Sequence, residues 1–524
     1  MKISTFNIYA LHVFSIIVLL SSCKTDGVSL GDSDEETQNI KIAFAGVTES
    51  NVSEIQASAN LLTTQADKIN KSILVDDGFV IETENTDNGH SNPTNKLLHN
   101  DRNKNSFAAA TPLNIGIKVR LLLYEVESDG SLTYKANIGA AVQQNFFKVS
   151  LVKNTKYKYI AYSYNNFDVY PPSPADENNP VIPTSTAFSL IYASGDINVL
   201  EDPVHVNVVF RHTTSRISIG VDAQSYFATS ITELNVNLDN VILTTHNLNL
   251  FDGTLIGGVL TANPSNISFQ FANFENSPAK KLSQDRVYTS TPLNSYTYKI
   301  NRLAVSKNGT NEVLISEANP RTITASGFTG PLSTVYFSRN YIYPAKNFDG
   351  ELWASGNLFY DADATAVYRQ YRFEVARSST TTEACNYYFN WNTYLSRKET
   401  GDNTNNIGDP FSRVYPLNKW KTPSQSDYNN LIANSNLTTN GSGGLIFTNK
   451  NVASQSITLH QAGRITGSGC DVSNTTDGQY WTSSESSSAN GTIFETGNVG
   501  STPRTEFDPE RKDRGASIRC IRAN

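Results

Sequence analysis

Charged side chains are scarce in this chain, and no part of it is strongly basic. Asp, Glu, Lys and Arg make up 17% of its 524 residues, and the formal net charge is −7. Proteins that bind nucleic acid or an anionic membrane surface do so with clustered Lys and Arg, which displace counterions. The composition therefore argues against both kinds of partner.

Recognisable catalytic motifs are missing as well. The sequence has no His-Glu-x-x-His, Cys-x-x-Cys, phosphate-loop or Gly-x-Ser-x-Gly pattern. Asp361 and Asp363 fall on one face of an extended segment, as a carboxylate pair for glycoside hydrolysis could. A solvated turn explains the same two residues, and the sequence identifies no cleft for them. We therefore expect no enzymatic activity and no cofactor.

Beyond the N-terminus, no apolar run is long enough to span a bilayer. Met1-Lys2 is positively charged, and Val13 to Leu20 form a short apolar stretch that is followed by Ser-Ser-Cys23. This junction resembles the lipobox of bacterial lipoproteins, which implies that residues 1–22 are a signal peptide and that Cys23 is acylated. The alternative is a plain secretory signal that ends in Cys. Both interpretations predict export, and acylation predicts an outer-membrane, cell-surface lipoprotein attached to the membrane only by its lipid.

Aromatic and turn-forming residues are abundant instead. The chain has 25 Tyr and 25 Phe, with many Asn, Ser and Thr, which is typical of an exported β protein. Apolar residues alternate with others over 115–123, 204–208, 217–221 and 234–238, which is the period of a β-strand. Almost no helical period is sustained before residue 420. The pattern predicts a mostly β fold of antiparallel sandwiches.

Shifts in composition indicate the domain limits. Residues 23–39 are polar and acidic and predict a tether. We expect a first β-sandwich over residues 40–211 and a second over 212–347. Turn residues at Asn347-Phe-Asp-Gly350 then precede a change toward Trp, Asn and Gly, so that residues 348–524 form a third domain.

The first two domains carry motifs of a known family. The stretch from Val206 to Val221 contains Phe-Arg-His followed by an alternating strand, and strands are expected at 118–124 and 156–162. In this order they resemble the fimbrillin family, the subunits and accessory proteins of type V fimbriae, over roughly residues 23 to 345. The resemblance implies tandem transthyretin-like β-sandwiches.

The same resemblance implies a mode of assembly. In fimbrillins a trypsin-like protease cuts after a basic residue in an early loop and releases the first strand. Loss of that strand leaves a groove in the N-terminal sandwich, and the C-terminal donor strand of the next subunit fills this groove. Arg102 lies in a polar stretch ahead of the strand at residue 115, and Lys104 is the alternative cleavage site. The competing interpretation is a surface Arg that is never cut.

The third domain carries six ordered markers. These are 353–359 (Trp-Ala-Ser-Gly-Asn-Leu-Phe), 388–393 (Tyr-Phe-Asn-Trp-Asn-Thr), 420–424 (Trp-Lys-Thr-Pro-Ser), 462–464 (Ala-Gly-Arg), 479–484 (Gln-Tyr-Trp-Thr-Ser-Ser) and 515–522 (Gly-Ala-Ser-Ile-Arg-Cys-Ile-Arg). They resemble a FISUMP domain, a bacterial surface module related to the C-type-lectin-like fold, which implies an α+β domain. Ser424 is the expected helix N-cap, with Asp427 three residues on.

The resemblance also bears on the cysteines and on ligand contacts. The family commonly has a cysteine where Phe411 stands, paired with the one corresponding to Cys520. Cys520 therefore needs another partner or stays free; we favour Cys470, with Cys385 as the alternative. The long loops of the fold imply ligand contacts, and the oxygen donors there that could bind Ca²⁺ are Asp471, Asn474, Asp477 and Glu485.

Together these features predict a non-enzymatic fimbrial tip adhesin. The third domain follows the second sandwich, so a free donor strand is not expected, and the subunit would accept a strand without donating one. The expected partners are other fimbrial subunits and a glycan or a host or bacterial surface protein. The alternative is an anchored cell-surface lipoprotein that binds glycan or protein without polymerising.

Overall fold

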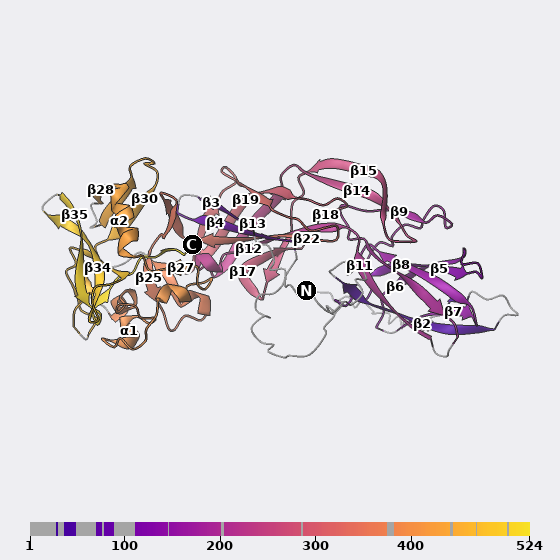
Figure 1. The fold of residues 1–524 in the computed structure, drawn as a ribbon, viewed down its shortest axis with the longest axis horizontal. Coiled ribbons are helices and arrows are strands. Elements are labelled where there is room, and N and C mark those ends of the chain that lie inside the picture. Colours follow the sequence, from indigo (N-terminus) through magenta and orange to yellow (C-terminus); the bar gives the residue numbers. More distant parts are fainter. Residues whose placement is uncertain are drawn as a thin grey trace, which may run out of the picture.

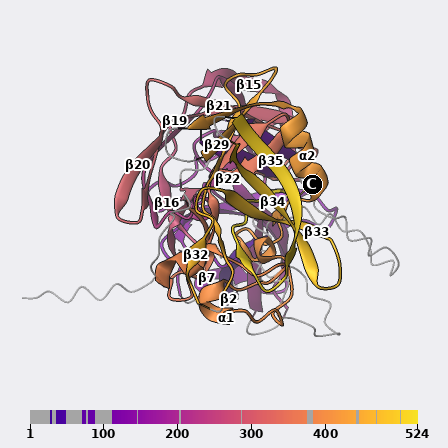
Figure 2. The same cartoon turned by 90° about the vertical axis from the view of Figure 1, so that its left-hand side faces the viewer.

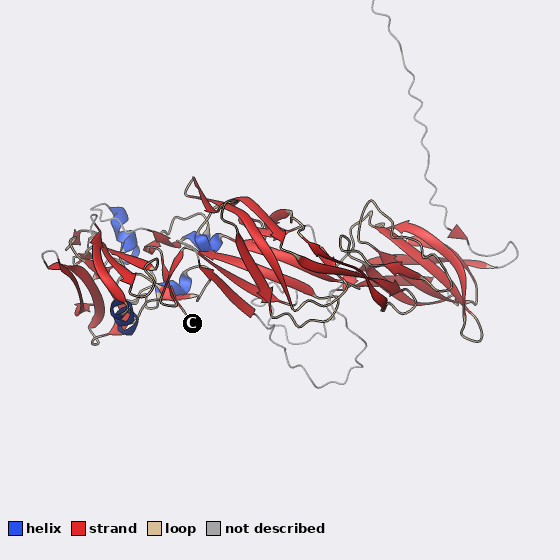
Figure 3. Cartoon of the chain, turned by 90° about the horizontal axis from the view of Figure 1, so that it is seen from above, coloured by secondary structure: helices blue, strands red, loops and turns tan. Residues whose placement is uncertain are grey.

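The computed structural model describes residues 28–29, 36–48, 70–75, 78–87, 111–144, 146–200, 204–284, 287–374, 382–440, 444–467, 469–499 and 502–523. They form an elongated molecule of three units in a row (Figure 1). Strands run through all three units, and helices gather toward the C-terminal unit (Figure 3). The fold is mostly β, as predicted. Among the described residues, no helix has both the length and the apolar character to cross a bilayer.

The first unit is one sheet, sheet A, that bends back on itself. Its strands lie in the order β1 (Val28–Ser29), β7 (Phe147–Val152), β2 (Thr37–Thr48), β11 (Val204–His212), β10 (Ile191–Asn198), β8 (Lys156–Ser163), β5 (Lys118–Val126) and β6 (Leu132–Ala141). β10 and β11 share a short ladder at a corner, and the halves on either side of it enclose a common core. That core includes Ile40, Val119, Leu121, Val149 and Val208.

The middle unit is a sandwich of two sheets. Sheet B has the order β16 (Phe271–Phe274), β17 (Ser277–Ser283), β12 (Ser215–Asp222), β22 (Val335–Tyr343), β4 (Val80–Thr86) and β3 (Asn70–Val75), with β18 (Val287–Thr289) also paired to β12. Sheet D consists of β13 (Ser230–Leu238), β19 (Ser295–Lys307) and β20 (Thr310–Ile315), with β21 (Arg321–Ser326) also paired to β19. Their inner faces share one buried cluster that includes Ile81, Ile219, Val236, Tyr298 and Ile342. A short helix, η2 (Gln224–Tyr226), follows β12.

A third sheet, sheet C, joins the first and middle units. It contains β15 (Leu255–Ser265), β14 (Val241–Asn249) and β9 (Val181–Pro183). Leu248 of β14 and Ile182 of β9 are buried in one cluster with Tyr124 and Tyr162 of sheet A. Sheet C therefore covers the outer face of part of sheet A, and this explains why Tyr124 and Tyr162 are buried on the face opposite the sheet A core.

The expected limits of the first sandwich do not hold for residues 70–86. These residues form β3 and β4, and β4 pairs along its length with β22 of sheet B. The expected range 40–211 thus mixes strands of two units: β2 belongs to sheet A, and the next two strands belong to sheet B. The sequence of β4 could not reveal this, because after Val80 and Ile81 it contains only polar residues and shows no apolar alternation.

The C-terminal unit is built from short sheets and helices. Its strands are β23 (Ala345–Phe348), β24 (Glu351–Ala354), β25 (Asn357–Tyr360), β26 (Tyr371–Glu374), β27 (Trp420–Lys421), β28 (Ser435–Asn440), β29 (Gly444–Asn449), β30 (Ser456–His460), β31 (Arg464–Ile465), β32 (Val472–Ser473), β33 (Gly478–Glu485), β34 (Asn490–Val499), β35 (Thr502–Arg511), β36 (Gly515–Ala516) and β37 (Ile521–Arg522). Its helices are η3 (Val367–Arg369), η4 (Thr382–Tyr387), α1 (Arg397–Thr400), η5 (Pro410–Arg413) and α2 (Gln425–Ala433). Seen end-on, the sheet of β33, β34 and β35 lies nearest the viewer (Figure 2).

Helix α2 begins where the sequence predicts. The Ser424 hydroxyl accepts a hydrogen bond from the Asp427 backbone N–H at 3.2 Å, and the Asp427 carboxylate accepts one from the Ser424 backbone N–H at 2.7 Å. This reciprocal capping box satisfies two N–H groups that the first turn of a helix leaves without partners. Tyr428 and Leu431 are buried against the domain core.

Candidate functional site

Strand β2 occupies a slot between two other strands of sheet A. It pairs antiparallel with β7 from Thr37 to Ile42, and parallel with β11 from Ile40 to Thr48. Ile40 and Ile42 are buried in the sheet A core. Without β2, strands β7 and β11 would stand about 9–10 Å apart, twice the usual spacing of neighbouring strands, with an apolar floor below the gap. Removal of β2 would therefore leave a gap as wide as one strand.

The predicted processing sites lie outside the described residues. Cys23, Arg102 and Lys104 all fall in ranges that the structure does not describe. The strands around them are described, however. A cut after Arg102 or Lys104 would separate β2, β3 and β4 from the rest of the chain.

Strand β4 is bound to the C-terminal unit through a buried carboxylate. Glu82 is 3% exposed. It forms an ion pair with Arg522 of β37, and its Oε1 lies 3.6 Å from Nζ of Lys419 and 3.6 Å from Nζ of Lys71. The neighbouring Glu84 lies 3.1 Å from the Lys419 ammonium. A segment near the N-terminus therefore helps to fix the last described strand of the C-terminal unit.

A second charged contact joins the same two units. Asp222 of β12 is 1% exposed. It accepts hydrogen bonds from Arg339 of β22 at 3.0 Å and from the Tyr415 hydroxyl of the C-terminal unit at 2.7 Å. Burial, together with the charge on Asp222, raises the pKa of Tyr415 above its ordinary value, so that the phenol stays protonated and continues to donate. The two contacts hold the C-terminal unit on the end of sheet B.

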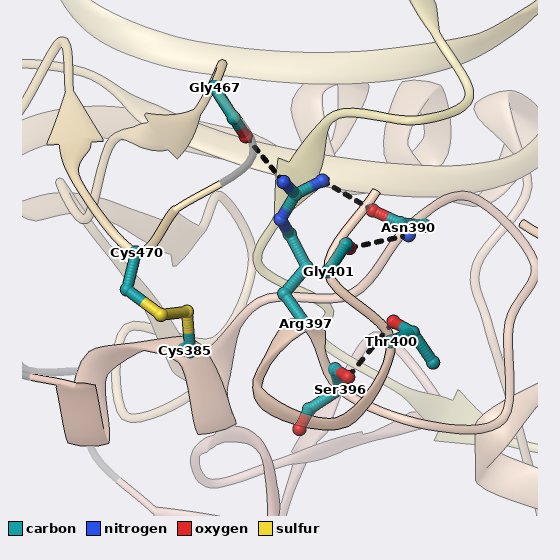
Figure 4. The surroundings of a disulfide bond; sticks show 8 residues. All are labelled: Cys385, Asn390, Ser396, Arg397, Thr400, Gly401, Gly467 and Cys470. Atoms are coloured by element: carbon teal, nitrogen blue, oxygen red, sulfur yellow. Dashed lines mark hydrogen bonds between the residues drawn. A yellow bond between two sulfur atoms is a disulfide. The ribbon is translucent and has the colours of Figure 1, made fainter. Parts of the chain in front are cut away.

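The disulfide differs from the favoured prediction. Cys385 of η4 is bonded to Cys470, with their Cα atoms 5.4 Å apart (Figure 4). Cys520 is free and buried. Both expected pairs, Cys470 with Cys520 and the alternative Cys385 with Cys520, are therefore wrong. Cys520 packs instead in the core cluster that also contains Phe411, the residue in place of the family's cysteine. Burial raises the pKa of the Cys520 thiol, which makes it less reactive.

Arg397 stabilises the loop ahead of Cys470. Its Nη1 donates to the Asn390 side-chain oxygen at 2.8 Å, and its Nη2 donates to the Gly467 carbonyl (Figure 4). The guanidinium is buried, and burial lowers its pKa from the ordinary value. The disulfide and this arginine together fix the base of the loop that contains Asp471 and Asn474.

The predicted Ca²⁺ ligands are not brought together. Asp477 and Glu485 flank β33 at opposite ends, which separates them by roughly 25 Å at the rise of an extended strand. Asp471 and Asn474 are exposed on the loop at β32, and the Glu485 carboxylate forms an ion pair with Lys512. These four residues therefore cannot coordinate one Ca²⁺ ion.

A different group of carboxylates does converge. Oxygen atoms of Glu495 on β34 and of Glu506 and Asp508 on β35 lie within 4.8 Å of one another. The Arg504 guanidinium contacts Glu495 at 2.6 Å and Glu506 at 3.0 Å, and therefore already offsets much of their charge. Burial and the neighbouring Asp477 raise the pKa of Glu495. The alternation of Arg504, Glu506 and Asp508 was the sequence signal for this shared face.

A polar cleft of about 810 Å³ lies between the middle and C-terminal units. Asp361 and Asp363 both line it. Asp361 accepts from Arg372 at 2.9 Å, whereas the Asp363 side chain is 89% exposed and its backbone N–H donates to Asp361. One carboxylate is neutralised and the other is solvated, so this geometry favours the solvated turn over a glycosidase pair.

Neither a protein-family model nor a curated protein matches the chain. Solved structures do match. A candidate cell adhesion protein from Bacteroides fragilis is 12% identical, with 60% of this chain and 95% of that chain covered and a TM-score of 0.31. The fimbrial anchor protein Mfa2 from Porphyromonas gingivalis is 14% identical, with 40% and 78% covered and a TM-score of 0.20. A candidate polysaccharide binding protein from Bacteroides thetaiotaomicron is 12% identical, with 38% and 71% covered and a TM-score of 0.22. Scores this low carry no inference about shared function.

Proposed function

We propose that this protein is a non-enzymatic adhesin of bacterial surface fimbriae that occupies the terminal, tip position. It accepts a donor strand from a neighbouring subunit, and its C-terminal unit binds a glycan or a surface protein. The observation that carries this proposal is the position of β2 between β7 and β11. Replacing β2 by an incoming strand would restore main-chain hydrogen bonds on both sides and cover the apolar floor.

The C-terminal unit supports acceptance without donation. Strand β22 lies between β12 and β4, and the chain after it continues directly into β23 and β24. At the other limit of the unit, β37 is held between β24 and β27. A strand that is paired on both edges is not free to enter a neighbour's groove. The subunit would therefore terminate a polymer rather than extend it.

We assign ligand binding to the C-terminal unit as a FISUMP-type, lectin-like domain. The capping box of α2 and the burial of Trp353 and Trp481 are consistent with the ordered markers in its sequence. Asp471, Asn474 and Asp477 are the proposed contacts on one loop. Glu485 would belong to a separate contact, because the length of β33 separates it from that loop.

An anchored lipoprotein is the second candidate, and β4 favours it. In that role Cys23 stays acylated and the chain is not cut. Strands β2 and β4 belong to one N-terminal segment and to two different sheets, so releasing this segment would open both units. It would also remove Glu82 from Arg522 and Lys419.

The first test is N-terminal sequencing and intact mass of the protein from sheared surface material and from membranes. A start at Asn103 or Asn105 in the sheared material supports processing at the proposed sites. An acylated Cys23 start in every fraction supports the anchored protein and contradicts strand replacement.

A variant tests whether processing is required for assembly. Arg102→Ala combined with Lys104→Ala should leave a full-length lipidated protein that is excluded from fimbriae. Lys96→Ala is the matched control in the same stretch and should assemble normally. Normal fimbriae that carry the uncut double variant would contradict the tip proposal.

A further inference from the structure

A small cleft in the C-terminal unit is lined by basic side chains. It has a volume of about 230 Å³ and lies between β23, the turn after β24, and β30. Lys346, His460 and Arg519 all line it, together with Ser355 and Thr458. No Asp or Glu lines it, although the chain as a whole has a net charge of −7. The cleft is thus a local concentration of positive charge in an acidic protein.

Arg519 is the buried member of this group. It is 1% exposed. Its Nη1 donates to the Ala354 carbonyl at 3.0 Å, and its Nη2 donates to the Thr458 carbonyl at 2.8 Å. These acceptors are neutral, and no carboxylate of the described residues lies within ion-pair distance of the guanidinium. Buried charges in proteins are normally paired, because an unpaired charge loses its hydration without compensation.

The cleft has two further basic residues in its lining, Lys346 and His460. Lys346 is on β23 and His460 ends β30, and both are partly buried. Within the described part of the chain, neither side chain forms an ion pair. Burial and the positive charge of the nearby Arg519 lower the pKa of His460, so the imidazole is mainly neutral at neutral pH. An anion in the cleft would favour the protonated imidazole, because its charge would offset that of Arg519.

We propose that this cleft is a binding site for a compact oxyanion, the sulfate group or the carboxylate of an acidic sugar. Lys346 and His460 supply donors at its mouth, the Ser355 and Thr458 hydroxyls can add hydrogen bonds, and Arg519 provides the positive potential behind them. The volume is below the about 300 Å³ at which pockets for larger ligands begin, so one charged group or one sugar ring is accommodated. This inference does not depend on whether the N-terminal segment is processed.

The experiment is a thermal unfolding titration of the full chain, followed by tryptophan fluorescence. All four Trp residues lie in the C-terminal unit, at positions 353, 391, 420 and 481, so the signal reports on the unit that holds the cleft. Sodium sulfate and sodium glucuronate are compared with sodium chloride at equal ionic strength. A bound anion stabilises the folded state with a saturable dependence on its concentration, whereas general salt effects do not saturate.

Saturable stabilisation by sulfate, by glucuronate or by both supports the site. Sulfate alone identifies a sulfate group as the ligand, and glucuronate alone identifies a sugar carboxylate. Lys346→Ala should then weaken the apparent affinity about tenfold, the loss expected for one charge-assisted hydrogen bond. Lys421→Ala is the matched control, because Lys421 is on the same unit and its side chain is 44% exposed. The proposal is overturned if neither anion saturates, or if the two lysine variants bind alike.

Discussion

Replacing Glu82 by Gln should uncouple the C-terminal unit from sheet B. Burial lowers the pKa of Arg522 to about 10, so the guanidinium is still charged at neutral pH and needs its partner. The Glu82 side chain is 4% exposed and that of Arg522 is 12% exposed, which makes this a buried pair. Removing one member of a buried ion pair costs about 3–5 kcal/mol, because the other charge is left without a partner. We expect that loss in the unfolding free energy of the C-terminal unit.

Urea unfolding followed by tryptophan fluorescence measures this loss. Glu36→Gln is the matched control, because Glu36 forms an exposed pair with Lys153 and such pairs contribute about 0–1 kcal/mol. The double variant Glu82→Gln with Arg522→Gln should recover part of the stability, since no lone charge then stays buried. An unchanged transition in Glu82→Gln would refute the assignment of Glu82 as a lock between the two units.

Four further predictions concern the C-terminal unit. Cys470→Ser should lower the stability of this unit by about 2–5 kcal/mol, because the disulfide closes a long loop. Thiol titration should find Cys520 unreactive until the protein unfolds. Ready labelling of Cys520 in the native protein would contradict its burial. Ser424→Ala should lower the unfolding free energy in urea by about 1 kcal/mol through loss of the helix cap, whereas Ser424→Thr should retain part of it. An equal loss in Ser424→Thr would argue against capping. Because the pKa of His460 is lowered in the folded state, its contribution to stability should be complete above pH about 6.5 and decrease as the pH falls below that value. In chloride buffer, His460→Gln should therefore lose less unfolding free energy between pH 7.5 and 5.5 than the unmodified protein. An identical loss in both proteins would contradict this cause.

Local features were predictable where the cause is local. Ser424 and Asp427 lie three residues apart, so their capping box can be inferred without knowing the rest of the fold. The alternation along β5 and β12 likewise identified strands, because every second residue of each packs into an apolar core. Partners distant in sequence were not predictable in the same way. The Glu82–Arg522 pair joins residues 440 positions apart, and nothing in either neighbourhood indicates the other.

The cysteines show the same limit. Three late cysteines allow three pairings, and the choice depends on Cα distances that composition does not contain. The resemblance supplied a preference for Cys520, but it could not show that Phe411 and Cys520 share an apolar core. The candidate ligand residues failed for a related reason. Asp477 and Glu485 are close in sequence, which suggested one cluster. The extended strand β33 nevertheless places them far apart in space.

The position of β4 makes the two candidate functions separable by the site of processing. A donor strand in sheet A can replace β2 alone, so loss of the β3–β4 hairpin would not be compensated. That loss would expose the edge of β22, remove the buried Val80 and Ile81, and leave Arg522 without Glu82.

Strand replacement is therefore energetically simplest if the cut falls between β2 and β3. Lys68 is the basic residue of that interval, residues 49–69. A cut at Lys68 is thus the alternative to the proposed cut at Arg102 or Lys104. It predicts an assembled protein that starts at Ile69 and a Lys68→Ala variant that does not assemble, whereas the proposed cut predicts normal assembly of Lys68→Ala. Lys96→Ala should assemble in either case. A start at Asn103 with residues 23–102 absent from the particle would contradict the cut at Lys68, and it would mean that sheet B has lost two strands that no donor replaces. A start at Asn103 with that fragment still bound would mean that the chain is cut and β2 stays in its slot.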